Sequence, residues 1–250
     1  MAILDGDPWI RRFHHDADSR VTLVCFPYAG GSASWFHPLS AALRSSLQVV
    51  ALQYPGRQDR HAERPRTTIA ELADESFAAL RPLLTRPVAF LGHSLGATVA
   101  FEVARRMRAE LDAEPVTLFA SGRRAPSRHR EERTYRLDDV GLVAELAALG
   151  GTDPRILGEP GLLAMILPVL RADYQAAETY RLPPGPPLTC PIVVLTGDDD
   201  PVVTPDEAQA WSGHTTGAFE LHTFPGDHFF PARHTAALTA LLRDRLSSPA

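Results

Sequence analysis

The sequence predicts an α/β fold built on a mostly parallel, doubly wound sheet with a helical lid insertion. Three observations lead to this class. Short apolar runs resemble buried strands, helical patterns alternate with most of them, and one interval between strands is much longer than a crossover connection needs. A chain of 250 residues can build one deep core, so we expect a single domain over residues 1–250.

Four runs have the apolar character of strands that are buried on both faces of a parallel sheet, and two further runs extend the set. They cover residues 21–26, 47–54, 88–92, 116–121, 192–197 and 219–224. The last run is more mixed in polarity than the others. Strands of this kind that alternate with helices indicate βαβ units.

Helical patterns fill most of the intervals between these runs. Thr68-Ile69-Ala70-Glu71 is a capping-box sequence and predicts a helix from there to about residue 84. A second helix is expected at 95–111. A third is expected at 231–246, where leucines fall on one stripe.

The longest interval lies between the fourth and fifth runs and holds about 70 residues, whereas a crossover needs about a dozen or more. It contains helical patterns at 138–150 and 160–180. We interpret residues 127–187 as an inserted helical lid over the mouth of the sheet. The alternative is a second structural subdomain.

Composition excludes several classes of protein. The net charge of −5 argues against nucleic acid as a general partner. No apolar run approaches the length of a membrane span, and the N-terminal stretch lacks the apolar core of a signal peptide. Cys25 and Cys190 both lie beside apolar runs and are expected to be buried, reduced thiols. We therefore expect a cytoplasmic protein that does not contact membranes.

Gly92-His93-Ser94-Leu95-Gly96 stands between a predicted strand and a predicted helix. A sharp strand-to-helix turn leaves little room for side chains, which explains the two glycines, and it raises the Ser94 hydroxyl above the sheet. Gly-x-Ser-x-Gly alone is a weak signal, and the alternative is a serine that caps the helix. Serine becomes a useful nucleophile only when a base takes its proton.

Later loops offer the acid and the base that such a serine needs. Asp198, Asp199 and Asp200 follow the run at 192–197, and we favour Asp200 because it lies deepest in the turn, with Asp198 as the second choice. His228 lies in the loop between the last run and the C-terminal helix. The chain order serine, aspartate, histidine is that of the α/β-hydrolases.

An oxyanion site requires two backbone N–H groups that point at the developing negative charge. One is expected from Leu95, directly after the nucleophile. The other is expected from Ala29 in the loop after the first strand, where Gly30 and Gly31 permit a turn. The phosphate-loop pattern GxxxxGK[ST] is absent, and no cluster has metal-ligand spacing, so we expect neither a nucleotide nor a metal.

Five separated motifs resemble those of the type II thioesterases that accompany polyketide synthases and non-ribosomal peptide synthetases. They are FPYAGGSA, QYPGRQDR, GHSLGA, GDDDPVV and GDHFF, in this order along the chain. The family pattern Gly-x-x-Asp-x-x-Val falls on Gly197, Asp200 and Val203, which supports Asp200. The family often has methionine after the nucleophile where this chain has Leu95, a change that matters little for a backbone amide.

This resemblance implies an α/β-hydrolase fold with a helical lid, and an editing enzyme that hydrolyses acyl thioesters. The acyl group would be carried on the phosphopantetheine arm of an acyl or peptidyl carrier protein, so the enzyme itself would need no cofactor. A carboxylesterase or lipase would use the same triad. A non-catalytic binding protein of this fold would have a broken triad, whereas Ser94, Asp200 and His228 are all present.

Two segments, one leading into the insertion and one within it, suggest contacts with such a substrate. Residues 123–136 hold six arginines against two glutamates in an acidic chain. Carrier proteins are generally acidic around the serine that bears the arm, so Arg123, Arg124, Arg128 and Arg130 are candidates for docking; the alternative is a solvated loop. In the predicted helix at 160–180, part of an apolar set is expected to line an acyl chamber: Leu162, Leu163, Met165, Ile166, Leu167, Val169 and Leu170.

Overall fold

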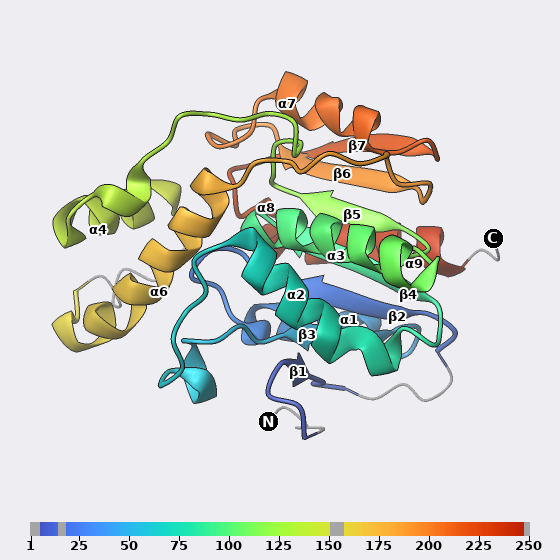
Figure 1. The fold of residues 1–250 in the computed structure, drawn as a ribbon, viewed down its shortest axis with the longest axis horizontal. Helices are drawn as coiled ribbons and strands as arrows, with labels where there is room; N and C mark the ends of the chain where they lie inside the picture. Colours follow the sequence, from blue (N-terminus) through green and yellow to red (C-terminus); the bar gives the residue numbers. More distant parts are fainter. Residues whose placement is uncertain (1–5, 15–18, 151–157, 248–250) are drawn as a thin grey trace.

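A seven-stranded sheet forms the centre of the computed structural model, which describes residues 6–14, 19–150 and 158–247 (Figure 1). The order of the strands across the sheet is β1-β3-β2-β4-β5-β6-β7. They are β1 Ile10–Arg11, β2 Thr22–Phe26, β3 Gln48–Leu52, β4 Val88–His93, β5 Leu118–Ser121, β6 Ile192–Gly197 and β7 Phe219–Phe224. All neighbours are parallel except β1 and β3. The mostly parallel sheet is therefore confirmed, while the two-residue strand β1 was not predicted.

Helices cover both faces of the sheet, and the strand side chains alternate between the two layers. Val24 and Phe26 of β2 pack under α2 (Ile69–Leu80) and α3 (Leu95–Leu111). Leu23 and Cys25 point to the opposite face, where α1 (His37–Leu43) and α9 (Thr235–Ser247) pack. This alternation gives the doubly wound arrangement that the sequence predicts.

Helix boundaries differ from the expected ones mainly where helices are short. The helix at 95–111 lies where it was expected, and the first helix continues beyond Leu80 as a single 3₁₀ turn. The expected helix at 231–246 is divided at His234 into α8 (Phe230–Arg233) and α9. Two short helices were missed, α1 and α7 (Pro205–Gln209), because one or two turns carry little periodic signal.

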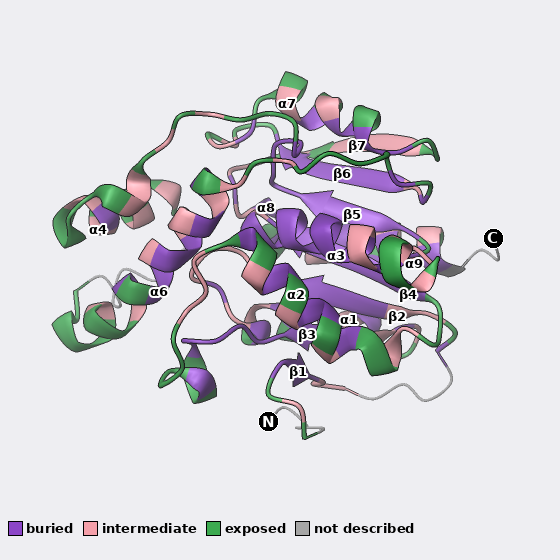
Figure 2. Cartoon of the chain, in the orientation of Figure 1, coloured by how far each residue is buried: buried purple, intermediate pink, exposed green. Residues whose placement is uncertain are grey.

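The long interval between β5 and β6 contributes helices beyond the carboxyl ends of the strands, at the left of Figure 1. They are the 3₁₀ turn η4 (Thr134–Arg136), α4 (Asp139–Leu149) and α6 (Pro160–Thr179). Residues 151–157 of the predicted lid lie outside the described residues. Figure 2 shows that strands β2 to β6 and the first half of α3 are largely buried, whereas β7, α4 and the first turns of α6 are only partly buried or exposed.

Both cysteines are free and buried. Burial raises the pKa of the Cys190 thiol to about 12, with a further contribution from Glu114. Within the described ranges, no helix is both long and apolar enough to cross a bilayer.

Candidate active site

Ser94 lies in a strained turn between β4 and α3. Its backbone has φ of 53° and ψ of −120°, a region that side chains rarely adopt. Its amide donates to the carbonyl of Ser121 over 2.8 Å. A Cβ atom at Gly92 would lie 2.3 Å from the Gly96 carbonyl oxygen, and one at Gly96 would lie 2.0 Å from that of Phe26. The two flanking glycines are therefore required by close backbone packing.

His228 and Asp200 form a buried pair at the ends of β7 and β6. The Nδ1 atom of His228 lies 2.9 Å from one carboxylate oxygen of Asp200 and 3.1 Å from the other. The two side chains are 4% and 0% exposed. Asp200 also accepts a 2.8 Å hydrogen bond from the amide of Val202, which fixes the carboxylate.

Asp198 serves a different purpose. Its carboxylate accepts the amide of Gly226 over 2.7 Å and so holds the turn that leads to His228. The structure thus brings Asp200, and not Asp198, to the imidazole. The catalytic roles of Ser94, Asp200 and His228 remain predictions that this geometry fits.

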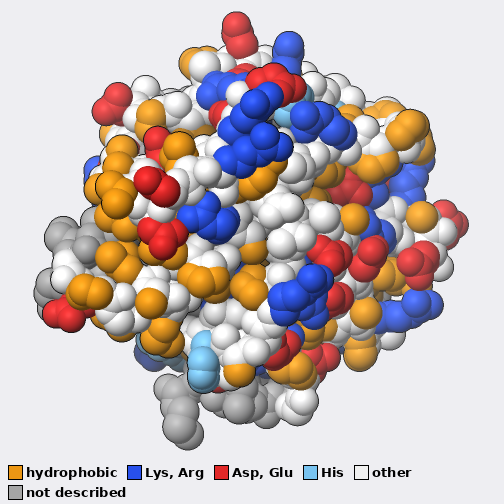
Figure 3. Space-filling model, turned by 60° about the vertical axis from the view of Figure 1, so that its left-hand side comes forward, with side chains coloured by type: hydrophobic (Ala, Val, Ile, Leu, Met, Phe, Trp, Pro, Cys, Tyr) orange, Lys and Arg blue, Asp and Glu red, His pale blue; other side chains and the backbone are white. Residues whose placement is uncertain are grey.

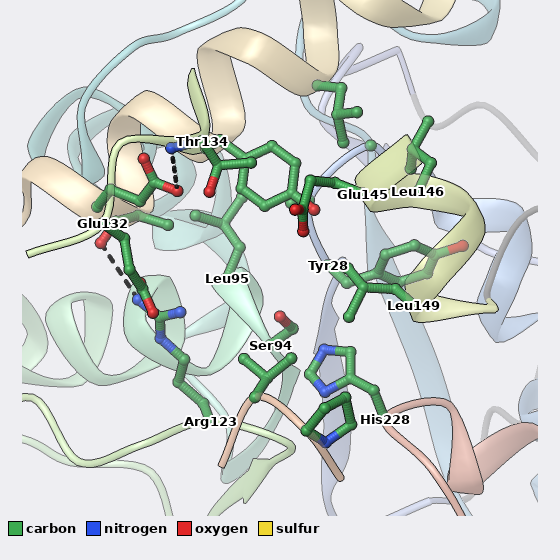
Figure 4. Close-up of a pocket in the computed structure, with 18 of the residues that line it drawn as sticks. Tyr28, Ser94, Leu95, Arg123, Glu132, Thr134, Glu145, Leu146, Leu149 and His228 are labelled. Atoms are coloured by element: carbon green, nitrogen blue, oxygen red, sulfur yellow. Dashed lines mark hydrogen bonds between the residues drawn. The ribbon is translucent and has the colours of Figure 1, made fainter. Parts of the chain in front are cut away.

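A cavity of about 460 Å³ opens over Ser94 and His228 (Figure 4). This volume falls in the range of about 300–1,000 Å³ that is typical of small-molecule sites. Its apolar lining includes Leu146 and Leu149 of α4 and Ile166 and Leu170 of α6. Charged and polar groups gather at another part of the wall, among them Arg123, Arg124, Glu132, Thr134 and Glu178. The cavity therefore joins an apolar part with a polar one.

The two amides expected to bind an oxyanion also belong to residues that line this cavity. Leu95 is the first residue of α3, where backbone amides have no partner within the helix. Ala29 lies in a turn closed by the hydrogen bond from the Gly31 amide to the Tyr28 carbonyl, 2.9 Å long. Its own amide donates to no protein group in the part of the chain that the structure describes. Neither amide is thus occupied by a protein acceptor in the described part of the chain.

His93 lies behind His228 and does not line the cavity. Its Nδ1 is 3.0 Å from the Ser121 hydroxyl, and its ring stacks on Trp35 with centroids 5.0 Å apart. The ring centroid of His228 is 5.1 Å away. Burial, followed by the repulsion of His228, holds the pKa of His93 well below its usual value. We therefore expect a neutral imidazole that supports the loop of His228.

The arginine-rich segment requires a correction. Arg123 and Arg124 are buried, and they line the cavity. Arg124 forms a two-pronged pair with Glu132, while Arg123 donates to Thr98 Oγ1 over 3.1 Å. A buried, partnered guanidinium cannot meet the surface of a docking protein. The expected docking surface is therefore reduced to Arg128, which is exposed, and Arg130, which pairs with Glu207.

The apolar set of α6 also divides. Ile166 and Leu170 line the cavity, and Leu167 packs in a small cluster with Leu142 and Leu170. Leu162 and Met165 are among the exposed large hydrophobic residues and do not line the cavity. Only part of the set can therefore touch an acyl chain.

Sequence reasoning missed the acidic lining of the cavity, Glu132, Glu145 and Glu178. It also assigned no role to Arg57, although the motif QYPGRQDR contains it. Glu132 lies in a predicted loop and the other two in predicted helices, where nothing in the sequence separates a cavity-lining carboxylate from a solvated one. Among the described residues, no group of three or more His, Cys, Asp or Glu side chains could hold a metal ion.

A parallel sheet with a strained serine turn after β4, an aspartate after β6 and a histidine after β7 defines an enzyme of the α/β-hydrolase class. A model of the thioesterase domain matches residues 21–247. The chain belongs to the thioesterase family.

Three similar proteins are themselves named as thioesterases. A probable cadicidin biosynthesis thioesterase of Streptomyces griseus is 49% identical over 95% of this chain, which spans 66% of that protein. Thioesterase PikA5 of Streptomyces venezuelae is 46% identical over 91% of this chain and 81% of its own length. The solved structure of the type II thioesterase BorB from the borrelidin biosynthetic cluster is similar with a TM-score of 0.90. It is 49% identical and covers 96% of this chain and 98% of its own.

Proposed function

We propose that this thioesterase removes acyl groups from the phosphopantetheine arm of acyl or peptidyl carrier proteins in polyketide or non-ribosomal peptide synthesis. The observation that carries this proposal is the cavity under α4 and α6. Ser94 and His228 line this cavity, and Asp200 is bonded to His228. Similar proteins that are named as thioesterases of cadicidin and borrelidin biosynthesis support a role in such a pathway.

The first half of the proposed reaction transfers the acyl group to the enzyme. Ser94 Oγ attacks the thioester carbon while Nε2 of His228 accepts the hydroxyl proton, and Asp200 holds the Nδ1–H tautomer. The amides of Ala29 and Leu95 stabilise the tetrahedral oxyanion. The C–S bond then breaks, and the leaving thiolate takes the proton from the imidazolium. A thiol of pKa about 8.5 is a good leaving group.

Hydrolysis completes the cycle. Water attacks the acyl-serine carbon and gives a proton to His228, which restores the imidazolium. The bond from the carbonyl carbon to Ser94 Oγ breaks, and the serine recovers its proton from His228. The products are a free carboxylic acid and the original enzyme, so the reaction consumes only water.

Substrate competition tests this proposal against a carboxylesterase. Wild-type protein is given an acyl group on a carrier protein and the same acyl group as a p-nitrophenyl ester. We expect kcat/KM to be far higher for the carrier protein. A preference for the free ester would favour the carboxylesterase, and no turnover of either substrate would favour a binding protein.

We further infer that an acidic carrier protein docks beside Arg128 and Arg130. Figure 3 shows basic side chains gathered at the top of the lid-bearing face, and all of them are arginines because the sequence has no lysine. Opposite charges steer encounter, and salt screens this effect. Arg128→Glu should raise KM for a carrier protein severalfold at low salt and leave a free thioester unaffected.

Arg81→Glu provides the matched control. Arg81 is also exposed, but it lies just before β4, at the amino ends of the strands and away from the lid. Equal effects of the two substitutions, or a KM that does not respond to salt, would remove Arg128 from the docking surface.

The two free, buried thiols support our proposal that the reaction takes place in the reducing cytoplasm.

A further inference from the structure

A buried ion pair joins the lid helix α6 to the loop after β3. Arg57 follows β3, and Asp173 lies in the second half of α6; their side chains are 4% and 0% exposed. Burial raises the pKa of the Asp173 carboxyl, and the nearby Arg57 guanidinium and Gly30 amide oppose that rise. The charge of the Asp173 carboxylate is therefore stabilised chiefly by Arg57.

This pair also forms hydrogen bonds with the turn that carries the candidate oxyanion amide. We call this turn, residues 28–31, the oxyanion loop. Asp173 Oδ2 accepts the amide of Gly30 over 2.7 Å as well as the guanidinium of Arg57. Arg57 Nε donates to the carbonyl of Gly31 over 2.8 Å. The ion pair thus holds the backbone from both sides, directly after Ala29.

Packing shows how closely α6 lies on this loop. Gly30 has φ of 76°, and a Cβ atom there would lie 3.2 Å from Leu170 Cδ1. Gly56, with φ of 86°, would place a Cβ atom 3.2 Å from Val169 Cγ2. The helix therefore contacts both the oxyanion loop and the loop of Arg57 at positions where only glycine fits easily.

A stabilising role alone explains this arrangement poorly. Removing two charges from water costs nearly as much as their attraction returns, so a buried ion pair adds little net stability over an apolar pair. Its directional hydrogen bonds, however, fix the peptide units that follow the Ala29 amide. Oxyanion donors work only when they are held in place before the reaction, and losing one costs about 100- to 1,000-fold in kcat.

We propose that Asp173 and Arg57 are positioning residues that hold the oxyanion loop against α6, so that the lid helix completes the catalytic site. This proposal rests on the assignment of Ala29 to the oxyanion site. It makes the middle of α6 part of the catalytic scaffold rather than a cover that swings away.

The double variant Arg57→Met/Asp173→Leu separates positioning from stability. It replaces the buried charges with apolar side chains, an exchange that is often neutral or stabilising, but it removes both hydrogen bonds to the loop. We expect a folded protein whose kcat for a p-nitrophenyl ester falls about 10- to 100-fold, with KM changed less than about threefold. Asp173→Asn should show a smaller loss of the same kind.

A trifluoromethyl ketone that mimics the acyl group reports on the oxyanion site itself. Ser94 Oγ adds to its carbonyl carbon, the serine proton passes to His228, and the ketone oxygen becomes an oxyanion that the loop must bind. Its inhibition constant should rise by the same factor by which kcat/KM falls. Affinity for the carboxylic acid product, which carries no such oxyanion, should change little.

Glu63→Gln is the control, because Glu63 pairs with the buried Arg60 in the same loop without touching the oxyanion loop. A folded double variant with wild-type kcat and wild-type ketone affinity would overturn the proposal, as would an equal loss in Glu63→Gln. Should the double variant not fold, Asp173→Asn is judged by the same two measurements below its unfolding temperature. All substrates are free esters, so failure to hydrolyse a carrier-bound acyl group would contradict the proposed function and leave this test intact.

Discussion

The two ends of α6 lie in different surroundings although they belong to one helix. Near its start, Leu162 and Met165 are 45% and 57% exposed, and α4 beside it exposes Val140. In the second half, Leu170 and Ala176 are almost completely buried. Figure 2 shows this change along the helix. The lid therefore consists of an outer part, α4 with residues 160–166, and an inner part, residues 167–179.

Polar contacts reinforce the difference. The carboxylate of Glu178 accepts the amides of Thr134 and Tyr135, and the carbonyl of Ala177 accepts from Arg123. The outer part packs mainly through a small cluster around Leu142. Regions with few buried apolar contacts open at lower free energy than the core does. We therefore expect substrate entry to displace the outer part while the inner part stays on the sheet.

The largest effect is expected from the triad. The residual kcat of triad variants is the lowest rate against which lid variants can be compared. Ser94→Ala and His228→Ala should each lower kcat by several orders of magnitude, because the members act as a unit. Asp200→Asn should lose nearly as much by favouring the wrong imidazole tautomer. Steady-state kinetics on a free thioester measure these losses. Asp198→Asn is the control, and a greater loss there than in Asp200→Asn would make Asp198 the acid.

The next largest difference is expected in stability, because substitutions in the inner part of the lid should lower the free energy of unfolding more than those in the outer part. Asp173→Ala leaves Arg57 buried without its partner, and we expect the free energy of unfolding to fall by about 3–5 kcal/mol. Met165→Ala removes an exposed side chain of the same helix and should change it by less than about 0.5 kcal/mol. Urea unfolding followed by circular dichroism measures both. Similar losses would mean that the outer part is held as firmly as the inner part.

Acyl-chain preference should respond to cavity-lining residues only. Ile166→Trp fills part of the cavity and should shift kcat/KM toward shorter acyl chains by roughly tenfold, about the effect of one methylene group in a hydrophobic pocket. Met165→Trp, one residue away on the exposed side, should leave the profile unchanged. A series of acyl thioesters of increasing length measures the profile. If both variants shifted it equally, the cavity described above would not be the acyl chamber.

The smallest effect is expected below the lid, at Leu95. Leu95 is completely buried although it lines the cavity, and the role expected of it belongs to its backbone amide. Leu95→Met conserves volume and leaves the backbone amide in place, so kcat/KM should stay within about twofold. A Ki for the trifluoromethyl ketone that rose tenfold would show that the side chain, and not only the amide, shapes the oxyanion site.

Local signals explain why much of the architecture was predictable. The strand runs, the glycines around Ser94 and the order of Asp200 and His228 all depend on neighbours within a few residues. The structure places these residues where that order requires. Short elements such as α1 and α7 were missed because they offer only one or two turns of pattern.

Contacts between distant segments explain what remained unpredictable. Arg57 and Asp173 are 116 residues apart, and nothing in the sequence around either residue predicts that it pairs with the other. The arginines at 123 and 124 belong to a charge-rich run that resembles a solvated loop, yet tertiary packing buries them against Glu132 and Thr98. Burial of charge depends on partners from elsewhere in the chain, and a single sequence does not contain that information locally.

The strained backbone of Ser94 has a consequence for how this protein tolerates change. A non-glycine residue held in such a conformation costs about 1–3 kcal/mol, which is a sizeable part of the 5–15 kcal/mol that stabilises a typical domain. Part of the folding free energy is thus used to hold the backbone of Ser94 in an unfavourable conformation. Variants selected for heat resistance alone would gain from glycine at position 94, so any search for a more robust enzyme must select for turnover at the same time.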